Sequence, residues 1–266
     1  MGNDADEIRN WWSTSIIDMS PGKISFRGNE IENLIGNISF PQMIWMMVRG
    51  GLPTNEEASL FEAALVAGVD HGPQAPSIAA ARMAATCGVG INNAMATGIN
   101  MLGDIHGGAG EQCAELFYEI SSRIDNGVTI EKAIQEALRE WESGNGKIIS
   151  GFGHRFHKPI DPRAPRLLEL VRLAAKDNIV SGKYADIAEA IQSHLSIKKD
   201  IAMNIDGATA VIFCELGFPA PLSRGLFCLS RSVGILSHAW EQIEQGGRNK
   251  GPMPPKYLPK YILKNT

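Results

Sequence analysis

The chain has 266 residues, of which 44% are hydrophobic and 20% charged, as in folded globular proteins rather than disordered ones. Its 25 lysines and arginines against 29 aspartates and glutamates give a net charge of -4, without a long basic block, so nonspecific nucleic-acid binding is not expected. No apolar run could cross a bilayer, and the polar, acidic first residues do not resemble a secretory signal. The four cysteines are widely spaced without a CxxC pair, so we expect reduced thiols and a cytoplasmic protein.

The first regular element expected along the chain is a strand, because residues 23–27 alternate apolar and polar side chains after a Pro21-Gly22 turn. Beyond it, apolar residues recur at helical spacing, starting after the capping box at 54–57. A proline directly after Asp161 is typical of a helix start. The expected helices cover residues 55–67, 77–86, 110–124, 130–141, 162–173, 184–195, 208–216 and 222–244. The predicted class is all-α with a small N-terminal β-ribbon.

Two glycine-rich segments between helices carry a histidine each. They are residues 103–110, with His106, and residues 151–154, with His154. Glycines beside a histidine permit close backbone approach to a ligand, but glycine is also the usual residue at helix ends, so each segment alone fits both interpretations. The tail from 246 to 259 is rich in glycine and proline. We expect no regular helix there and interpret it as a segment that lies on a partner subunit.

Three of the six histidines, His71, His106 and His154, lie in expected loops or at helix ends. His238 falls inside the last long helix and is interpreted as a packing or surface residue. His157 follows His154 by three residues, a spacing that also occurs in metal pairs on helices. Nearby prolines oppose a helix there, and no further ligand follows at metal spacing, so no metal site is expected.

Asp206 is a carboxylate among apolar neighbours at the start of a helix. Taken alone, such a residue is most often an N-cap, whose side chain accepts a backbone N–H. The sequence contains no GxSxG elbow, P-loop or GxGxxG fingerprint. Capping and catalysis therefore both stay open for Asp206 by itself.

Taken together, five segments in a fixed order resemble the motifs of the citrate synthase superfamily. The segments are VDHGP at 69–73, DIHGGA at 104–109, GFGHR at 151–155 with DPR at 161–163, NIDG at 204–207, and LSRSVG at 229–234 with His238. Their order and spacing match from about residue 40 to residue 242. The chain is shorter than typical citrate synthases and is more similar to the compact citryl-CoA lyases and to the lyase module of ATP-citrate lyase.

The resemblance implies a reaction that makes or breaks a carbon–carbon bond between an acyl-CoA α-carbon and a 2-oxo acid carbonyl. Asp206 matches the family's base, and apolar surroundings would raise its pKa. His106 matches the donor to the enol oxygen. His154 matches the residue that polarises the oxo-acid carbonyl and, in cleavage, takes the hydroxyl proton. A coenzyme A thioester is then the substrate, and no bound cofactor is implied.

The resemblance also implies how the substrates are bound. Arg163 and Arg231 match guanidinium forks for carboxylates, and His71 matches a histidine that binds the oxo acid. The residues that match the CoA-binding loop are Gly151, Phe152, Gly153 and Lys158. The implied fold has a large domain of residues 1–108 and 217–266 and a small domain of residues 109–216.

The family forms homodimers, so we expect a homodimer with residues shared across subunits. In the family, an arginine of the second subunit precedes a proline at a position where this chain has Gly251-Pro252. Arg248 and Lys250 lie nearby, and Arg248 is the expected substitute. Without that cation, a smaller oxo acid such as pyruvate would be favoured.

The primary expectation is a lyase that cleaves citryl-CoA to acetyl-CoA and oxaloacetate. The alternative is a citrate or methylcitrate synthase, because both directions use the same three residues. Two further alternatives are a lyase for a smaller adduct such as citramalyl-CoA and a non-catalytic subunit that pairs with an acyl-CoA ligase partner. In each case the expected ligands are small molecules, and neither nucleic acid nor membrane is an expected partner.

Overall fold

The computed structural model describes residues 2–197, 201–254, 256–257 and 259–263. The chain divides into two compact units, residues 1–62 and residues 63–266. The predicted division into a discontinuous large domain and a small domain of residues 109–216 is a different partition, and it stays a prediction.

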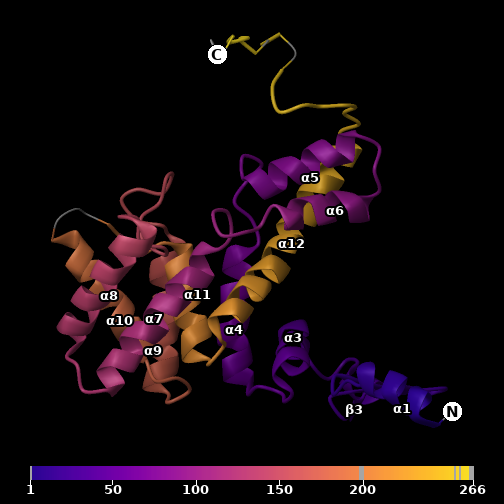
Figure 1. Ribbon diagram of the computed structural model, residues 1–266, viewed down its shortest axis with the longest axis horizontal. Helices are drawn as coiled ribbons and strands as arrows, with labels where there is room; N and C mark the ends of the chain where they lie inside the picture. Colours follow the sequence, from indigo (N-terminus) through magenta and orange to yellow (C-terminus); the bar gives the residue numbers. More distant parts are fainter. Residues whose placement is uncertain (1, 198–200, 255, 258, 264–266) are drawn as a thin grey trace. The chain divides into compact units, whose positions relative to one another are not determined.

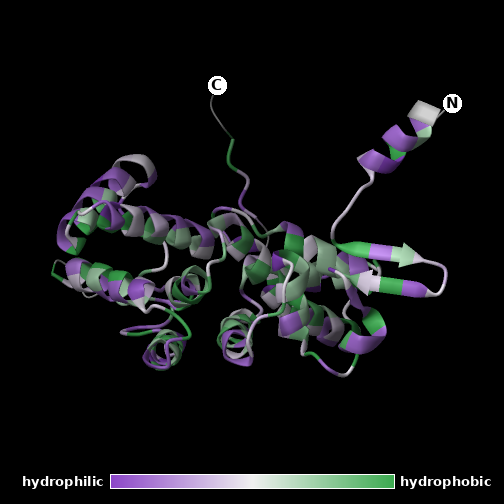
Figure 2. Cartoon of the chain, turned by 90° about the horizontal axis from the view of Figure 1, so that it is seen from below, coloured by the Kyte–Doolittle hydropathy of each residue, from purple (hydrophilic) through white to green (hydrophobic). Residues whose placement is uncertain are grey.

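The first unit contains the predicted β-ribbon and a set of short helices. Its three strands form one antiparallel sheet in the order β1-β2-β3, in which Ile17 pairs with Phe26 and Ser25 pairs with Glu30. Figure 2 shows green and purple residues alternating along the strands that follow the N-terminal helix. The elements are α1 (Gly2–Trp11), β1 (Ile17–Ser20), β2 (Lys23–Phe26), β3 (Asn29–Glu30), α2 (Ile31–Leu34) and α3 (Phe40–Arg49).

Helix α3 gives the first unit its buried aromatic contact. Ser39 and Gln42 form a capping box at its start, and Gly50 ends it in the left-handed conformation. Trp45 packs edge-on against Phe61, with the ring centroids 5.8 Å apart. Apolar burial at these two rings stabilises α3 against the chain that follows it.

Helices make up the second unit, and every helix predicted from the sequence is present within a few residues of its expected bounds. The all-α class with a small N-terminal ribbon is therefore confirmed. Helix α6 was not predicted. The helices are α4 (Asn55–Gly68, which begins in the first unit), α5 (Pro76–Thr86), α6 (Ile91–Asn100), α7 (Ala109–Asp125), α8 (Ile130–Asn145), α9 (Arg163–Lys176), α10 (Lys183–Ser196), α11 (Ile205–Glu215) and α12 (Ala220–Glu244).

Helix α12 carries two packing regions of the second unit. Its C-terminal half lies beside α5 and α6, where small residues let the helices approach closely (Figure 1). The residues of this core are Ala75, Ile78, Ala81, Ala94, Ile235 and Ala239. Helices α7, α8, α9, α10 and α11 gather into a bundle around α11, which is buried along most of its length (Figure 1). The site described next lies on the helix ends and loops between these regions.

None of the described helices combines the length and the hydrophobicity needed to traverse a bilayer. The four cysteines are all unpaired. Burial raises the pKa of the Cys113 thiol well above its usual range, so this thiol is protonated and unreactive at neutral pH.

Candidate functional site

Asp206 lies in the first turn of α11 without serving as its cap. The cap is Asn204, whose side chain accepts hydrogen bonds from the backbone N–H groups of Asp206, at 2.9 Å, and Gly207, at 3.3 Å. Burial raises the pKa of the Asp206 carboxyl, although the nearby positive charges of Arg231 and Arg163 oppose the shift. The capping interpretation of Asp206 is therefore wrong, and its carboxyl is left for another role.

The glycine loop at 151–153 is joined directly to the start of α11. The carbonyl of Gly151 accepts from the Asn204 backbone N–H at 3.0 Å, and that of Gly153 accepts from the Asn204 side-chain amide at 2.6 Å. Gly151, at φ +86°, faces Gly207 so closely that a Cβ on it would meet the Gly207 Cα at 2.9 Å. These contacts bring His154, which follows the loop, to the helix start that carries Asp206.

Two of the three backbone N–H groups of this loop, those of Phe152 and Gly153, already have acceptors. Phe152 donates to the carbonyl of Ile149 at 3.2 Å, and Gly153 donates to that of Ala202 at 2.7 Å. Phe152 is buried, whereas Lys158 is exposed. The role of Gly151, Phe152, Gly153 and Lys158 in CoA binding stays a prediction.

Hydrogen bonds fix the tautomer of His154. Its Nδ1 accepts from the backbone N–H groups of Phe156, at 3.1 Å, and His157, at 3.0 Å. Burial lowers the pKa of His154, and the neighbouring His157 and His71 lower it further, so the ring is neutral at pH 7. Because Nδ1 is an acceptor, the single proton lies on Nε2, and His154 presents a donor at that atom.

His106 has the opposite tautomer. Its Nε2 accepts from the backbone N–H of Ser77 at 3.2 Å and lies 3.0 Å from the Ser77 hydroxyl. Ser77 is in the first turn of α5, where backbone N–H groups have no partner within the helix. Burial and the charge of Arg231 lower the pKa of His106. The neutral ring therefore keeps its proton on Nδ1, which is a donor.

Arg163 is held by a buried carboxylate. Asp161, 2% exposed, accepts from the Arg163 backbone N–H at 3.1 Å and from its Nε at 3.0 Å and Nη2 at 2.9 Å. The second Asp161 oxygen also accepts from the backbone N–H of Ile205 at 3.1 Å. Asp161 therefore joins the start of α9 to the start of α11.

Arg231 lies buried on α12 and reaches the end of α4. Its Nε donates to the carbonyl of Gly68 at 3.0 Å, and its guanidinium lies over the Phe227 ring, 4.9 Å from the centroid. The charge of Arg231 acts on the pKa of Asp206, His106 and His71. Arg231 is thus electrostatically coupled to the predicted base, enol donor and oxo-acid ligand.

His71 packs against the histidines of the 151–157 segment. Its ring centroid lies 5.1 Å from that of His154 and 5.7 Å from that of His157. Burial lowers the pKa of His71, and the charges of Arg163 and Arg231 lower it further. One ring nitrogen from each of the three histidines falls within 4.8 Å of the others.

Such a group is close enough to hold a metal ion, and His71 is a third ligand that sequence spacing missed. The positive charges of Arg163 and Arg231, which lower the pKa of His71, disfavour a cation between these histidines and favour an anion. The expectation of no metal stays a prediction.

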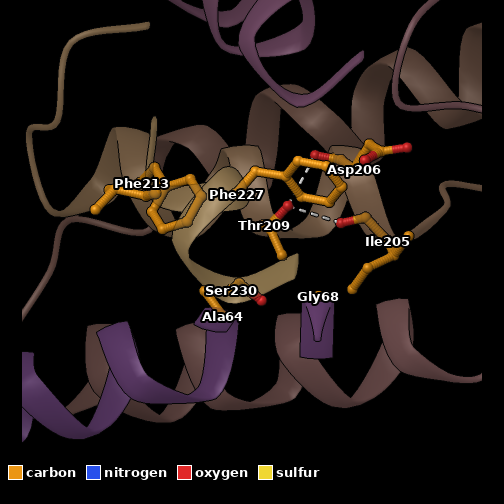
Figure 3. A pocket seen from close by; sticks show the side chains of 9 residues that line it. Ala64, Gly68, Ile205, Asp206, Thr209, Phe213, Phe227 and Ser230 are labelled. Carbon is orange, nitrogen blue, oxygen red and sulfur yellow. Dashed lines mark hydrogen bonds between the residues drawn. The ribbon is translucent and has the colours of Figure 1, made fainter. Parts of the chain in front are cut away.

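A small apolar pocket opens beside Asp206 (Figure 3). Its volume is about 10 Å³, which is room for one water molecule. The residues that line it are Ala64, Gly68, Ile205, Asp206, Thr209, Phe213, Leu226, Phe227 and Ser230. In this conformation, the side chains that line the pocket leave no room for a molecule larger than water on that side of the Asp206 carboxyl.

Arg248 lies exposed just beyond α12. The residues after it fold onto the end of α5, where Asn249 and Lys250 donate backbone N–H groups to Thr86 at 2.8 and 2.9 Å. No contact among the described residues joins Arg248 to the cluster of His71, Arg163 and Arg231. Its proposed action across a subunit boundary stays a prediction.

Sequence reasoning missed several residues that position this site. Arg224 of α12 holds the His106 loop, because its Nη2 donates to Asp104 at 2.6 Å and it also forms an ion pair with Glu111. His238 is neither simple packing nor free surface, since it contacts Asp70 at 3.3 Å and Arg82 at 3.3 Å. The helical spacing of Arg231 and His238, seven residues apart, was the available signal that they share a face.

Comparison with known proteins identifies the family. The family model "Citrate synthase, C-terminal domain" matches residues 53–253. The citrate synthase of Saccharolobus solfataricus is 31% identical over 215 residues, which are 79% of this chain and 54% of that protein. The citrate synthase of Haloferax volcanii is 28% identical over 199 residues, or 74% of this chain and 50% of that protein. The chain thus spans about half the length of the curated relatives it matches.

Among solved structures, the citryl-CoA lyase of Hydrogenobacter thermophilus superposes with a TM-score of 0.80 at 31% identity, covering 96% of both chains. A citrate synthase from Thermoplasma acidophilum, in a ternary complex with carboxymethyl coenzyme A and oxaloacetate, gives a TM-score of 0.67 at 26% identity, over 86% of this chain and 59% of that one. The predicted citrate synthase-like helical fold is confirmed.

Proposed function

Because the chain belongs to the citrate synthase C-terminal domain family, we propose that it cleaves citryl-CoA to acetyl-CoA and oxaloacetate. The observation that carries this choice is the structural likeness to a lyase. The citryl-CoA lyase of Hydrogenobacter thermophilus superposes with a TM-score of 0.80 at 31% identity, whereas the citrate synthase of Thermoplasma acidophilum reaches 0.67 at 26% identity.

The proposed cleavage moves electrons from the alcohol to the thioester. The hydroxyl group of the citryl moiety loses its proton, its oxygen becomes the carbonyl of oxaloacetate, and the adjacent carbon–carbon bond breaks. The electron pair of that bond forms the enolate of acetyl-CoA. The Nδ1–H of His106 donates to the enolate oxygen. The protonated carboxyl of Asp206 then gives its proton to the enolate carbon, which completes the methyl group.

The raised pKa of Asp206 suits this direction, because burial keeps a larger share of the carboxyl protonated at a given pH. In the reverse direction the same carboxylate takes a proton from the methyl group. Desolvation also makes it a stronger base in that role.

His154 acts at the oxygen of the alcohol as a hydrogen-bond donor. The Nδ1 that would have to carry a second proton already accepts two backbone N–H groups. We therefore place the Nε2–H of His154 on the alkoxide and carbonyl oxygen; a water molecule rather than the ring takes the hydroxyl proton, and solvent returns a proton to Asp206. This changes the expectation that His154 takes that proton.

Two guanidinium groups and one histidine hold the carboxylates in this proposal. Arg231, whose Nε donates to Gly68, offers its two Nη groups. Arg163 offers the Nη protons that Asp161 does not accept, and His71 adds a ring nitrogen beside them. Arg248, or Lys250, supplies the third cation from a partner subunit. The segment with Gly151, Phe152, Gly153 and Lys158 holds the CoA group.

We further propose a cytoplasmic homodimer. Five large apolar side chains form an exposed stripe on α12 at intervals of three and four residues, which is the spacing of a helix–helix contact. They are Leu229, Val233, Leu236, Trp240 and Ile243. A second copy of the chain covers this stripe in the proposed dimer, and an acyl-CoA ligase that makes citryl-CoA is the proposed functional partner.

The second candidate is a citrate or methylcitrate synthase, which one observation favours. His154 is a donor at Nε2, and polarising a carbonyl needs a donor. A lyase for citramalyl-CoA would fit the case in which no third cation reaches the substrate.

Coupled assays separate these candidates. Citryl-CoA is supplied in one assay, and acetyl-CoA with oxaloacetate in the other, and free CoA, acetyl-CoA and oxaloacetate are followed in both. We expect cleavage of citryl-CoA without release of free CoA. Release of CoA from acetyl-CoA plus oxaloacetate at a higher rate than cleavage would favour the synthase, and no turnover of either would favour the non-catalytic subunit.

A further inference from the structure

One face of α12 contacts the segment that connects α4 to α5. Arg231, Gly234 and His238 follow one another at helical spacing along this face. Arg231 donates to the carbonyl of Gly68 at 3.0 Å. At Gly234 the helix meets the Val69 carbonyl directly, because a Cβ there would overlap the oxygen. His71, the predicted oxo-acid-binding histidine, belongs to the same segment, so α12 supports the backbone that carries it.

The last contact of this face is a chain of hydrogen bonds through His238. A guanidinium group can only donate, so the Arg82 Nη1 donates to His238 Nδ1 at 3.3 Å. With Nδ1 as the acceptor, the ring proton lies on Nε2, which is 3.3 Å from each oxygen of the Asp70 carboxylate and donates to it. Arg82 itself is fixed by an ion pair with Glu241 and by a 2.9 Å hydrogen bond to Gln245.

Asp70 transmits this arrangement to the loop. Of the two Asp70 oxygens near His238, Oδ2 also accepts the backbone N–H of Gly72 at 3.0 Å, which closes a turn around the intervening residue. That residue is His71. The orientation of the Asp70 carboxylate therefore sets the direction in which the His71 backbone leaves the turn.

We propose that His238 is a positioning residue that fixes the Asp70 turn and thereby aims the His71 ring at His154. His238 touches no reacting atom in this role. Its action requires one donor and one acceptor on the same side chain, because it links an arginine to a carboxylate. The kinetic consequence rests on the proposed function, whereas the structural consequence does not.

Glutamine is the informative replacement at this position, because its amide also offers one donor and one acceptor. His238→Gln should keep the link, and His238→Ala should lose it. Ser237→Ala is the matched control, because Ser237 is an exposed neighbour on α12 whose hydroxyl only bonds the Val233 carbonyl of its own helix.

Hydrogen exchange of the peptide that spans residues 68–75 is the first measurement, made on the full chain without substrate. We expect faster exchange in His238→Ala, and exchange like that of the original protein in His238→Gln and Ser237→Ala. The second measurement is the Michaelis constant for citryl-CoA or oxaloacetate. The Michaelis constant should rise by roughly tenfold in His238→Ala, with a smaller change in kcat, because the net free energy of one hydrogen bond corresponds to about a tenfold change in binding.

The inference is overturned if His238→Gln exchanges as fast as His238→Ala, or if neither differs from the original protein. The glutamine variant alone decides the matter if the alanine variant does not fold, since unchanged exchange supports the link and faster exchange refutes it. Inactivity of the original protein toward every CoA substrate would end the proposed function, and the exchange result would still decide whether His238 positions the segment.

Discussion

At the scale of single residues, the cap of α11 lies two positions before the predicted base, so capping and catalysis fall on different residues. Asn204 caps α11, so the helix does not need the half-buried Asp206 carboxyl as its cap. The motif resemblance pointed to Asp206. Propensity alone indicated a cap, because aspartate and asparagine are both frequent at N-caps. It does not show whether Asn204 or Asp206 is the cap.

Asp206→Asn should abolish cleavage while the protein keeps its stability. The amide has nearly the same size but cannot give or take the proton at carbon, a loss that typically costs about a hundredfold to ten thousandfold in rate. The pKa of Asp206 is raised from its ordinary value of 3.8, so the ionised carboxylate destabilises the folded state at pH 7. The neutral amide removes that destabilisation. Turnover near that of the original protein would refute the assignment, and chemical denaturation checks the stability.

Asp161→Asn should do the reverse and lower stability. Asp161 has a lowered pKa: burial opposes the shift, but hydrogen bonds from Arg163 and Ile205 outweigh it. Its contribution is therefore present above pH 3.8 and lost as the pH falls through the lower folded-state value. We expect a loss of about 3 kcal/mol at pH 7, near the lower limit for breaking a buried pair, because Arg163 stays partly hydrated.

Urea denaturation of the Asp161→Asn variant and the original protein at neutral and acid pH is the measurement. The two free energies of unfolding should converge at acid pH. A difference that persists unchanged at the lowest pH would mean that the charge of Asp161 is not what stabilises the α9–α11 contact.

Arg231→Lys should weaken binding of the oxo acid or its CoA adduct. Lysine keeps the positive charge but has no planar fork and no Nε for the Gly68 carbonyl. The expected loss is roughly one to three kcal/mol for each charge-assisted hydrogen bond that is removed. An unchanged Michaelis constant would exclude Arg231 as a carboxylate ligand.

The tautomers of His106 and His154 could not be predicted from the sequence. Each depends on backbone N–H groups, from Ser77 in one case and from Phe156 and His157 in the other. Residue types carry no information about which ring nitrogen meets a backbone donor. The family motif identifies the histidine, and only the folded backbone identifies the atom that can donate.

At the scale of helices, periodicity predicted most of the long elements, but the prediction missed α6 although its sequence has a helical pattern. Ile91, Met95 and Ile99 follow one another at intervals of four residues and pack, partly buried, against the core around Ala94. Helix α3 has a capping box at Ser39, but its apolar residues are nearly continuous. The close contact of α12 with the 68–72 segment likewise depends on a glycine, whose packing role no periodicity measures.

Gly234→Ala should destabilise the protein, because the new Cβ would overlap the Val69 carbonyl oxygen and meet the Asp70 Cβ at 3.1 Å. Overpacking of this kind typically costs about 1–3 kcal/mol. Gly225→Ala is the control on the same helix, since its Cβ would meet only a Leu222 methyl at 3.9 Å. It should be neutral or stabilise by up to about 1 kcal/mol through helix propensity.

Thermal denaturation of the two glycine variants in parallel tests this expectation. Equal stabilities would show that α12 can move away from the 68–72 segment without cost. In that event the steric contact would not be what holds the His71 turn against the helix.

At the scale of the whole molecule, the described site within one chain is short of positive charge for a citryl group, which has two free carboxylates because its third carboxyl is the thioester. Arg163 and Arg231 are the guanidinium groups whose charges act on His71, and Arg163 is already paired with Asp161. An uncompensated carboxylate in a desolvated cleft would cost several kcal/mol, so binding of a citryl group requires a further positive charge. In the proposed dimer a second subunit covers the apolar stripe on α12, and Arg248, exposed four residues beyond the end of that helix, is the proposed source of the missing charge.

Mixing two inactive variants tests whether Arg248 acts across the dimer. In a hybrid of an Arg248→Ala chain and an Asp206→Asn chain, action in trans places both defects in one site and leaves the other intact. Random mixing would then restore roughly a quarter of the original activity, because half of the dimers are hybrids with one working site each. Action within one chain leaves a defect in every site and restores nothing. If Arg248→Ala alone is fully active, the same mixing with Lys250→Ala becomes the test, and if that variant is also fully active, the substrate has one carboxylate fewer than citryl-CoA.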